Sequence, residues 1–157
     1  MFPNSQSITF RSWYFQSLKA KCPPSNDIEW KMRAFEYHDK RFYLHYHYNA
    51  EVQTFIFYVT IAVKPRKASK YLAKVTLKNP DDERNVVSIT KNVLSMASAP
   101  RDMKSLLDSE SVMFVSWRAM RGILKWTNEA KDGTIMNKVM FEKTIEIGQK
   151  KPRTEPL

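Results

Sequence analysis

The segment "EVQTFIFYVTIAV", residues 51–63, constrains the fold more than any other part of the sequence. Successive side chains of a β-strand point to opposite faces, so a strand in this segment carries apolar residues on both of its faces. One face has Phe55, Phe57, Val59, Ile61 and Val63, and the other has Ile56, Tyr58 and Ala62. A strand that is apolar on both faces needs cover on both, which predicts a central position in a sheet.

Shorter alternating segments on either side of this run predict further strands. These segments are "SITFRSWYFQSL", "DIEWKMRAFEY", "DKRFYLHYHYN", "KYLAKVTLKN", "NVVSITKNVL", "SVMFVSW" and "NKVMFEKTIEI". The stretch around "APRDMKSLL" predicts one or two turns of helix over a sheet edge, and "TNEAKDGT" predicts a polar loop. About eight short strands separated by turns predict an all-β fold, an antiparallel β-sandwich with one or two short helices.

Length and composition fit a single globular domain. The chain has 157 residues, of which 43% are hydrophobic and 27% are charged, and a domain of this size can bury a substantial core. A single cysteine, Cys22, excludes an internal disulfide framework and fits a reducing compartment. No run reaches the roughly 18 apolar residues of a membrane span, and the N-terminus lacks the pattern of a secretory signal. We therefore expect a cytoplasmic or nuclear protein with no membrane partner.

The formal net charge of +10 indicates that the protein could bind a negatively charged partner. It is compatible with nucleic acid, an anionic lipid or an acidic protein. The segment "RKASKYLAK" with the preceding Lys64 forms a locally basic stretch, which is either a solvated face or a surface for acidic peptides or a nucleic-acid backbone. In the nucleic-acid alternative, Lys64, Arg66 and Lys67 contact phosphates while Tyr43 and Trp126 stack on bases.

The segment "NDIEWKM" alternates with period two. Ile28, Trp30 and Met32 are expected on one face, with charged residues between them. An indole offers a flat surface and one N–H donor, and a thioether adapts its shape, so this face suits the binding of another chain. The alternative is that the three side chains belong to the core, and the alternation itself leaves both open.

The order of these segments resembles the C-terminal substrate-binding domain of the Seven-in-absentia ubiquitin ligases, a TRAF-like β-sandwich. The stretches that carry the resemblance are "SITFRSWYFQSL", "DIEWKM", "VQTFIFYVTIAVKPRKASKYLAKVTL", "DSESVMF" and "NKVMFEKTIEI". It covers residues 8–147, which leaves residues 1–7 as a flexible N-terminus and 148–157 as a flexible basic tail. No single motif is diagnostic.

The resemblance implies a non-catalytic adaptor in ubiquitin-dependent turnover. In the family, a partner peptide lies along an edge strand and adds main-chain hydrogen bonds to it. The matching positions here are Ile28, Trp30 and Met32, with Ile8 and Phe10 on the neighbouring strand. The family also forms homodimers through the sandwich, and the apolar run "SVMFVSW" is a candidate surface for one.

Two features depart from the family. Residues 124–134, "LKWTNEAKDGT", form an insertion, in which Trp126 either anchors a partner or folds back on the sandwich. The zinc-bound RING of the family has no counterpart, since one cysteine and three histidines cannot supply its ligands. By itself, this chain is expected to be no enzyme and at most the substrate-binding part of a ligase.

Neither catalytic residues nor a cofactor is expected. His45 and His47 lie two apart on one strand and have the spacing of a chelating pair, but no cysteine or carboxylate is placed to complete a metal site. We expect them to face solvent, with no metal. Cys22 has no neighbouring base to activate it as a nucleophile.

Overall fold

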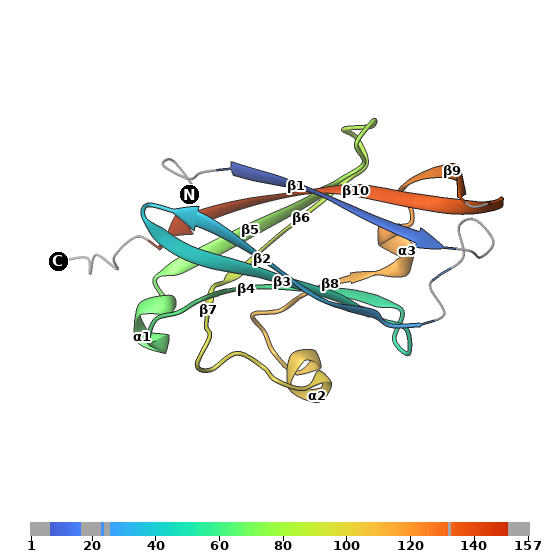
Figure 1. The fold of residues 1–157 in the computed structure, drawn as a ribbon. Helices are drawn as coiled ribbons and strands as arrows, with labels where there is room; N and C mark the ends of the chain where they lie inside the picture. The colour runs from blue at the N-terminus through green and yellow to red at the C-terminus, as the bar shows by residue number, and fades with distance from the viewer. Residues whose placement is uncertain (1–6, 17–22, 24–25, 132, 151–157) are drawn as a thin grey trace.

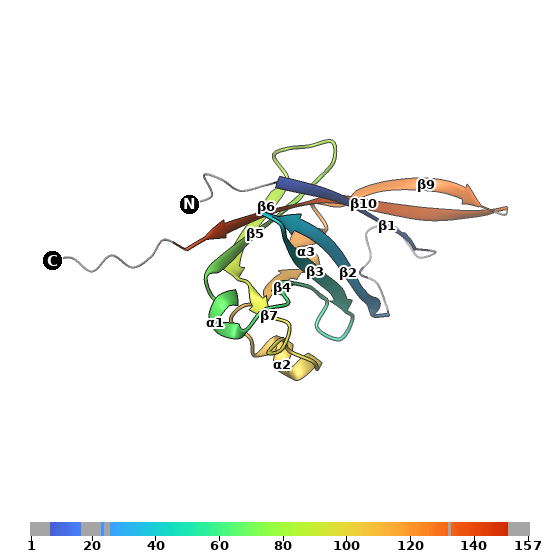
Figure 2. The same cartoon turned by 60° about the vertical axis from the view of Figure 1, so that its left-hand side comes forward.

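Two β-sheets of five strands each pack face to face in the computed structural model, with three short helices outside them (Figures 1 and 2). The structure describes residues 7–16, 23, 26–131 and 133–150, and within 7–16, 28–31, 128–131 and 134–138 it describes the backbone. Cys22 and most of the two predicted flexible ends therefore lie outside the described residues.

The first sheet is built around its longest strand, and its order is β1-β10-β5-β6. A further strand, β9, pairs with the first half of β10. It lies on the same side of β10 as β5, which pairs with the second half. The strands are β1 (Ser7–Gln16), β5 (Tyr71–Lys78), β6 (Val86–Asn92), β9 (Lys125–Lys131) and β10 (Thr134–Gln149). Every pairing in this sheet is antiparallel.

The second sheet has the order β2-β3-β4-β7, and β8 pairs with β4 beside β7. Its strands are β2 (Ile28–Tyr37), β3 (Lys40–Asn49), β4 (Thr54–Ile61), β7 (Leu94–Ser95) and β8 (Met113–Ser116). The pairings are antiparallel except for two residue pairs between β4 and β7. The predicted antiparallel sandwich is confirmed, with ten strands and three helices in the described residues in place of about eight strands and one or two helices.

The predicted central strand is confirmed as β4, which lies between β3 on one side and β7 and β8 on the other. Its inner side chains belong to the main core between the sheets, and its outer side chains, Ile56 and Tyr58, join a second apolar cluster with Leu106 and Val112. Leu106 comes from α2 (Met103–Leu107), the predicted helix, which lies under the outer face of the second sheet (Figure 1). Both faces of β4 are thus covered, as its sequence requires.

The segment "NVVSITKNVL" contributes to both sheets, which the sequence does not reveal. It forms β6 of the first sheet up to Asn92, and β7 of the second sheet begins at Leu94. Val93 between them is buried, and its N–H donates to the carbonyl oxygen of Tyr71 at 3.1 Å. The chain therefore crosses from one layer to the other at a single residue.

The predicted polar loop "TNEAKDGT" is wrong, because most of it is β9, whose hairpin with β10 turns at Gly133 with a φ of 77°. The indole of Trp126 on β9 meets that of Trp117 edge to face, with ring centroids 6.1 Å apart. Trp117 is buried at the start of α3 (Trp117–Met120). Of the two alternatives for Trp126, the structure shows the one in which it folds back on the sandwich.

The run "SVMFVSW" does not present an exposed apolar surface. Met113 and Val115 of β8 are buried in the main core, and only Phe114 between them is exposed. The prediction that this run is an exposed surface is wrong, because β8 pairs with β4 and turns alternate residues inward.

One charged side chain lies inside the sandwich. Lys143 on β10 is 1% exposed, and its Nζ lies 3.4 Å from the ring centroid of Tyr46 on β3. The face of an aromatic ring attracts a cation, and more strongly where water is excluded. This contact links β10 of the first sheet to β3 of the second.

Candidate functional site

The candidate site is the outer edge of β2. Within the part of the chain that the structure describes, β2 pairs with β3 alone, so it forms one edge of the second sheet. A tight hairpin turn joins the two strands, and its central residues His38 and Asp39 have φ values of 46° and 61°. Positive φ at both positions characterises the turn whose twist suits an antiparallel hairpin. The two strands are therefore in fixed register at this end.

The register is regular over most of β2 and shifts near its start. Residues from Lys31 to Tyr37 pair one to one with β3, whereas Ile28 pairs with Tyr48. The shift places one extra residue on β2 between Ile28 and Lys31, the pattern of a β-bulge. The bulge lies in the segment where Ile28, Trp30 and Met32 are expected to share one face, so the one-to-one pairing with β3 is interrupted there.

Met32 is accessible. Its side chain is 58% exposed, more than that of any other large hydrophobic residue whose exposure the structure describes. It pairs with His45 on the outer face of the sheet, and the next residue on that face of β2 is the exposed Ala34. Met32 is thus a surface residue, and the core alternative fails for it. For Ile28 and Trp30 the structure describes the backbone.

Ile8 and Phe10 lie on the other sheet. They belong to β1, where Ile8 pairs with Ile145 and Phe10 pairs with Lys143 of β10. The prediction that Ile8 and Phe10 lie on the strand next to Ile28, Trp30 and Met32 is therefore wrong, because β1 pairs with β10 and β2 pairs with β3. β1 and β2 are the edge strands of different layers, and the five predicted site residues do not share one sheet.

The outer face beside β2 holds an ordered polar and aromatic group. The rings of His45 and Tyr58 stack with an interplanar angle of 2° and centroids 4.5 Å apart. A hydrogen bond of 2.8 Å joins His45 Nε2 and Thr60 Oγ1. Burial lowers the pKa of His45 to about 4 and also lowers the pKa of His47, which the nearby Asp27 partly offsets. His47 is 4% exposed, so the expectation that it faces solvent is wrong, whereas His45 is half-buried on the outer face.

The neutral state of His45 predicts a pH dependence of stability. In the unfolded chain its pKa returns to about 6.5, so between pH 6.5 and 4 the unfolded state binds the proton first. The free energy of unfolding should therefore fall by about 1–2 kcal/mol between pH 7 and pH 5, after allowance for partial solvent screening. Urea denaturation at both pH values measures this. His45→Gln should make the fall shallower and leave the contribution of His47, whose pKa is also lowered. An unchanged profile in that variant would contradict the assignment.

Metal ligation has no support at the two histidines. In the described ranges, no three side chains of His, Cys, Asp or Glu gather closely enough to hold a metal ion. His45 is engaged with Thr60, and His47 lies inside the fold. No helix in the described part of the chain is long and apolar enough to cross a membrane.

The basic stretch and the proposed stacking aromatics lie apart. Lys64, Arg66 and Lys67 are exposed at and around α1 (Pro65–Ala68), at one end of the sandwich. Trp126 on β9 is at the opposite end (Figures 1 and 2) and packs against Trp117. Tyr43 is half-buried on the outer face of β3. The structure does not bring these residues together.

Comparisons with known proteins identify no relative of this chain among protein families or curated proteins, since no family model matches the chain and no curated protein matches its sequence. The molecule is an antiparallel β-sandwich of two sheets with an edge strand that carries an exposed methionine.

Proposed function

We propose that this chain is a non-catalytic protein-interaction module that binds a short extended peptide of a partner protein along the outer edge of β2. The observation that carries the proposal is an edge strand of ten residues, regular from Lys31 to Tyr37, with Met32 exposed on it. Alternate N–H and C=O groups of an edge strand point away from its sheet, so they can pair with a guest strand.

The chemistry of the edge suits a peptide of modest sequence specificity. Main-chain hydrogen bonds supply much of the affinity in strand addition, and alternate side chains supply the specificity. Met32 presents a flexible apolar contact, and the small Ala34 two residues on leaves room beside it for a guest side chain. The bulge before Lys31 limits the regular pairing surface to about seven residues.

The resemblance to the Seven-in-absentia substrate-binding domain supports the same role. Under this proposal the chain is an adaptor in ubiquitin-dependent turnover or signalling, in the cytoplasm or nucleus, and it works as a monomer or homodimer. The RING activity, where it is needed, comes from another domain or another protein.

The proposal predicts that truncation at the edge removes the partner and spares the fold. Trp30→Ala and Met32→Ala should each reduce the partner recovered from native cell extract at least tenfold, because each removes an anchor beside the guest strand. For Met32→Ala the melting temperature should stay within a few degrees of wild type, since an exposed side chain contributes little to stability. Affinity capture with quantitative mass spectrometry measures the first quantity, and thermal denaturation measures the second.

Val86→Ala is the matched control. Val86 is 45% exposed and lies on β6, the edge strand of the first sheet at the end opposite β1. This variant should retain the partner. If Val86→Ala loses the partner while Met32→Ala retains it, the binding edge is β6. If Trp30→Ala and Met32→Ala both unfold the chain, the pair is structural and the site assignment fails.

The alternative is a basic β-sandwich that binds nucleic acid or an acidic scaffold. The cations around α1 favour it. The distance between those cations and Trp126, and the burial of the Trp126 indole nitrogen, argue against base stacking beside them.

A further inference from the structure

Charge is unevenly distributed along the chain and over the fold. Residues 52–80 contain six lysines and arginines and no aspartate or glutamate. The acidic residues that follow them, Asp81, Asp82 and Glu83, lie in the turn between β5 and β6, where Asp81 pairs with Lys125 and Glu83 with Lys78. Acidic groups are thus engaged at that turn, while α1 and its flanks are left strongly basic.

The cations around α1 form one cluster. Lys64, Arg66, Lys67 and Lys70 lie within seven residues and are all exposed. The N–H of Lys150 donates to the carbonyl oxygen of Lys70 at 2.8 Å, which brings a fifth cationic residue to the same place. In the described part of the chain, no carboxylate pairs with the first four side chains. We call these five residues the α1 cluster.

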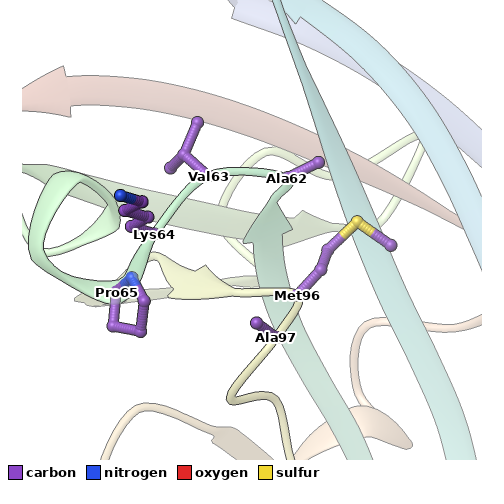
Figure 3. A pocket seen from close by; sticks show the side chains of 6 residues that line it. All are labelled: Ala62, Val63, Lys64, Pro65, Met96 and Ala97. Carbon is purple, nitrogen blue, oxygen red and sulfur yellow. The ribbon is translucent and has the colours of Figure 1, made fainter.

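An apolar hollow adjoins the α1 cluster. It has a volume of about 500 Å³, opens to solvent, and is lined by Ala62, Val63, Lys64, Pro65, Met96 and Ala97 (Figure 3). Met96 is 39% exposed, with its thioether at the hollow. Lys64 belongs to both the lining and the cluster, so a cation stands at the rim of an apolar surface.

Hydrogen bonds fix the two walls of the hollow to each other. The N–H of Met96 donates to the carbonyl oxygen of Ile61 at 3.0 Å. The buried hydroxyl of Ser95 donates to the carbonyl oxygen of Val63 and accepts from the N–H of Ala97. A hollow held in this way is formed before a ligand arrives, which lowers the entropic cost of binding.

We propose that the hollow and the α1 cluster together bind an acidic peptide segment that places one large apolar side chain in the hollow. The carboxylates of such a segment meet four or five cations, and its apolar side chain covers Met96 and Pro65. This site is separate from the edge of β2 and does not depend on it. A nucleic-acid strand fits less well, because Tyr71, the aromatic residue that follows Lys70 in the chain, is buried and offers no stacking surface.

The test uses synthetic nine-residue peptides on the full chain. One peptide carries four glutamates around a central leucine, a second has serine in place of the leucine, and a random-sequence oligonucleotide is the third probe. Fluorescence anisotropy at 50 and 150 mM salt measures binding. The leucine peptide should bind at least tenfold more tightly than the serine peptide, and Met96→Ser should remove most of that difference.

Charge reversal at the cluster is compared with a matched reversal elsewhere. The triple variant Lys64→Glu, Arg66→Glu, Lys67→Glu should weaken binding of the leucine peptide at least tenfold. The control variant Lys104→Glu, Arg118→Glu, Arg121→Glu changes the net charge equally at α2 and α3, and should weaken it less than threefold. Equal losses in both variants, equal affinity for the two peptides, or tighter binding of the oligonucleotide would each overturn the proposal.

Discussion

Replacing Phe42 by alanine is expected to lower the free energy of unfolding by about 3–5 kcal/mol. Phe42 is fully buried on β3, and its ring lies 5.7 Å from that of Phe35 and 5.4 Å from that of Tyr71, centroid to centroid. Phe35 belongs to the same sheet and Tyr71 to the other, so the truncation opens a cavity where the two layers meet. Urea denaturation followed by tryptophan fluorescence measures the effect.

Val52→Ala is the control for this prediction. Val52 is exposed in the turn between β3 and β4, and its truncation should change the free energy of unfolding by less than about 0.5 kcal/mol. Similar effects of Phe42→Ala and Val52→Ala would contradict the packing of the two sheets described here.

Reversing the charge of Lys143 is expected to leave the chain unfolded or to cost more than about 3 kcal/mol. The ammonium group lies over the face of Tyr46, where the ring attracts a cation and repels an anion. A carboxylate at this buried position has no solvent to stabilise it. Circular dichroism and urea denaturation of Lys143→Glu measure the outcome.

Lys143→Met separates the role of charge from that of volume. Methionine keeps an unbranched chain of similar length and removes the cost of burying a charge, so this variant should fold with a loss of about 1–2 kcal/mol. If Lys143→Glu is as stable as Lys143→Met, the cation over Tyr46 has no energetic role.

The sequence predicts the local parts of this fold well. The two-sided apolar pattern of β4 and the alternation of β3 follow from burial at period two. The helix at Met103–Leu107 lies within the stretch where the sequence predicts one, and Asp102 caps it, with its Oδ1 accepting from the N–H of Ser105 at 2.8 Å. These signals lie within short windows of residues, so no knowledge of distant partners is needed.

The features of the fold that the sequence does not predict depend on contacts between residues far apart in the chain. Nothing near Ser7–Gln16 indicates that β1 pairs with β10, more than 120 residues away. The polar composition of Lys125–Lys131 gives no strand signal, and this segment is a strand because β10 extends beyond β5 and offers it an edge. The change of layer at Val93 similarly depends on a hydrogen bond to Tyr71.

For the candidate sites too, the sequence indicates the chemistry of the residues but not their arrangement in space. The chemistry of Met32 could be inferred from its residue type, but the bulge before Lys31 and the exposure of the side chain could not. The basic character of α1 is evident in the sequence. The hollow beside it joins Ala62–Pro65 with Met96 and Ala97, and only the pairing of β4 with β7 brings these segments together.

Hydrogen–deuterium exchange with a bound peptide tests the role of the β2 edge most directly. A linear peptide selected on the wild-type chain from a displayed library provides the ligand. If a guest strand adds to the edge, backbone amides between Lys31 and Tyr37 should exchange at least tenfold more slowly in the complex, while those of β6 keep their rates. Slowed exchange confined to β6, or to any region other than β2, would contradict the assignment.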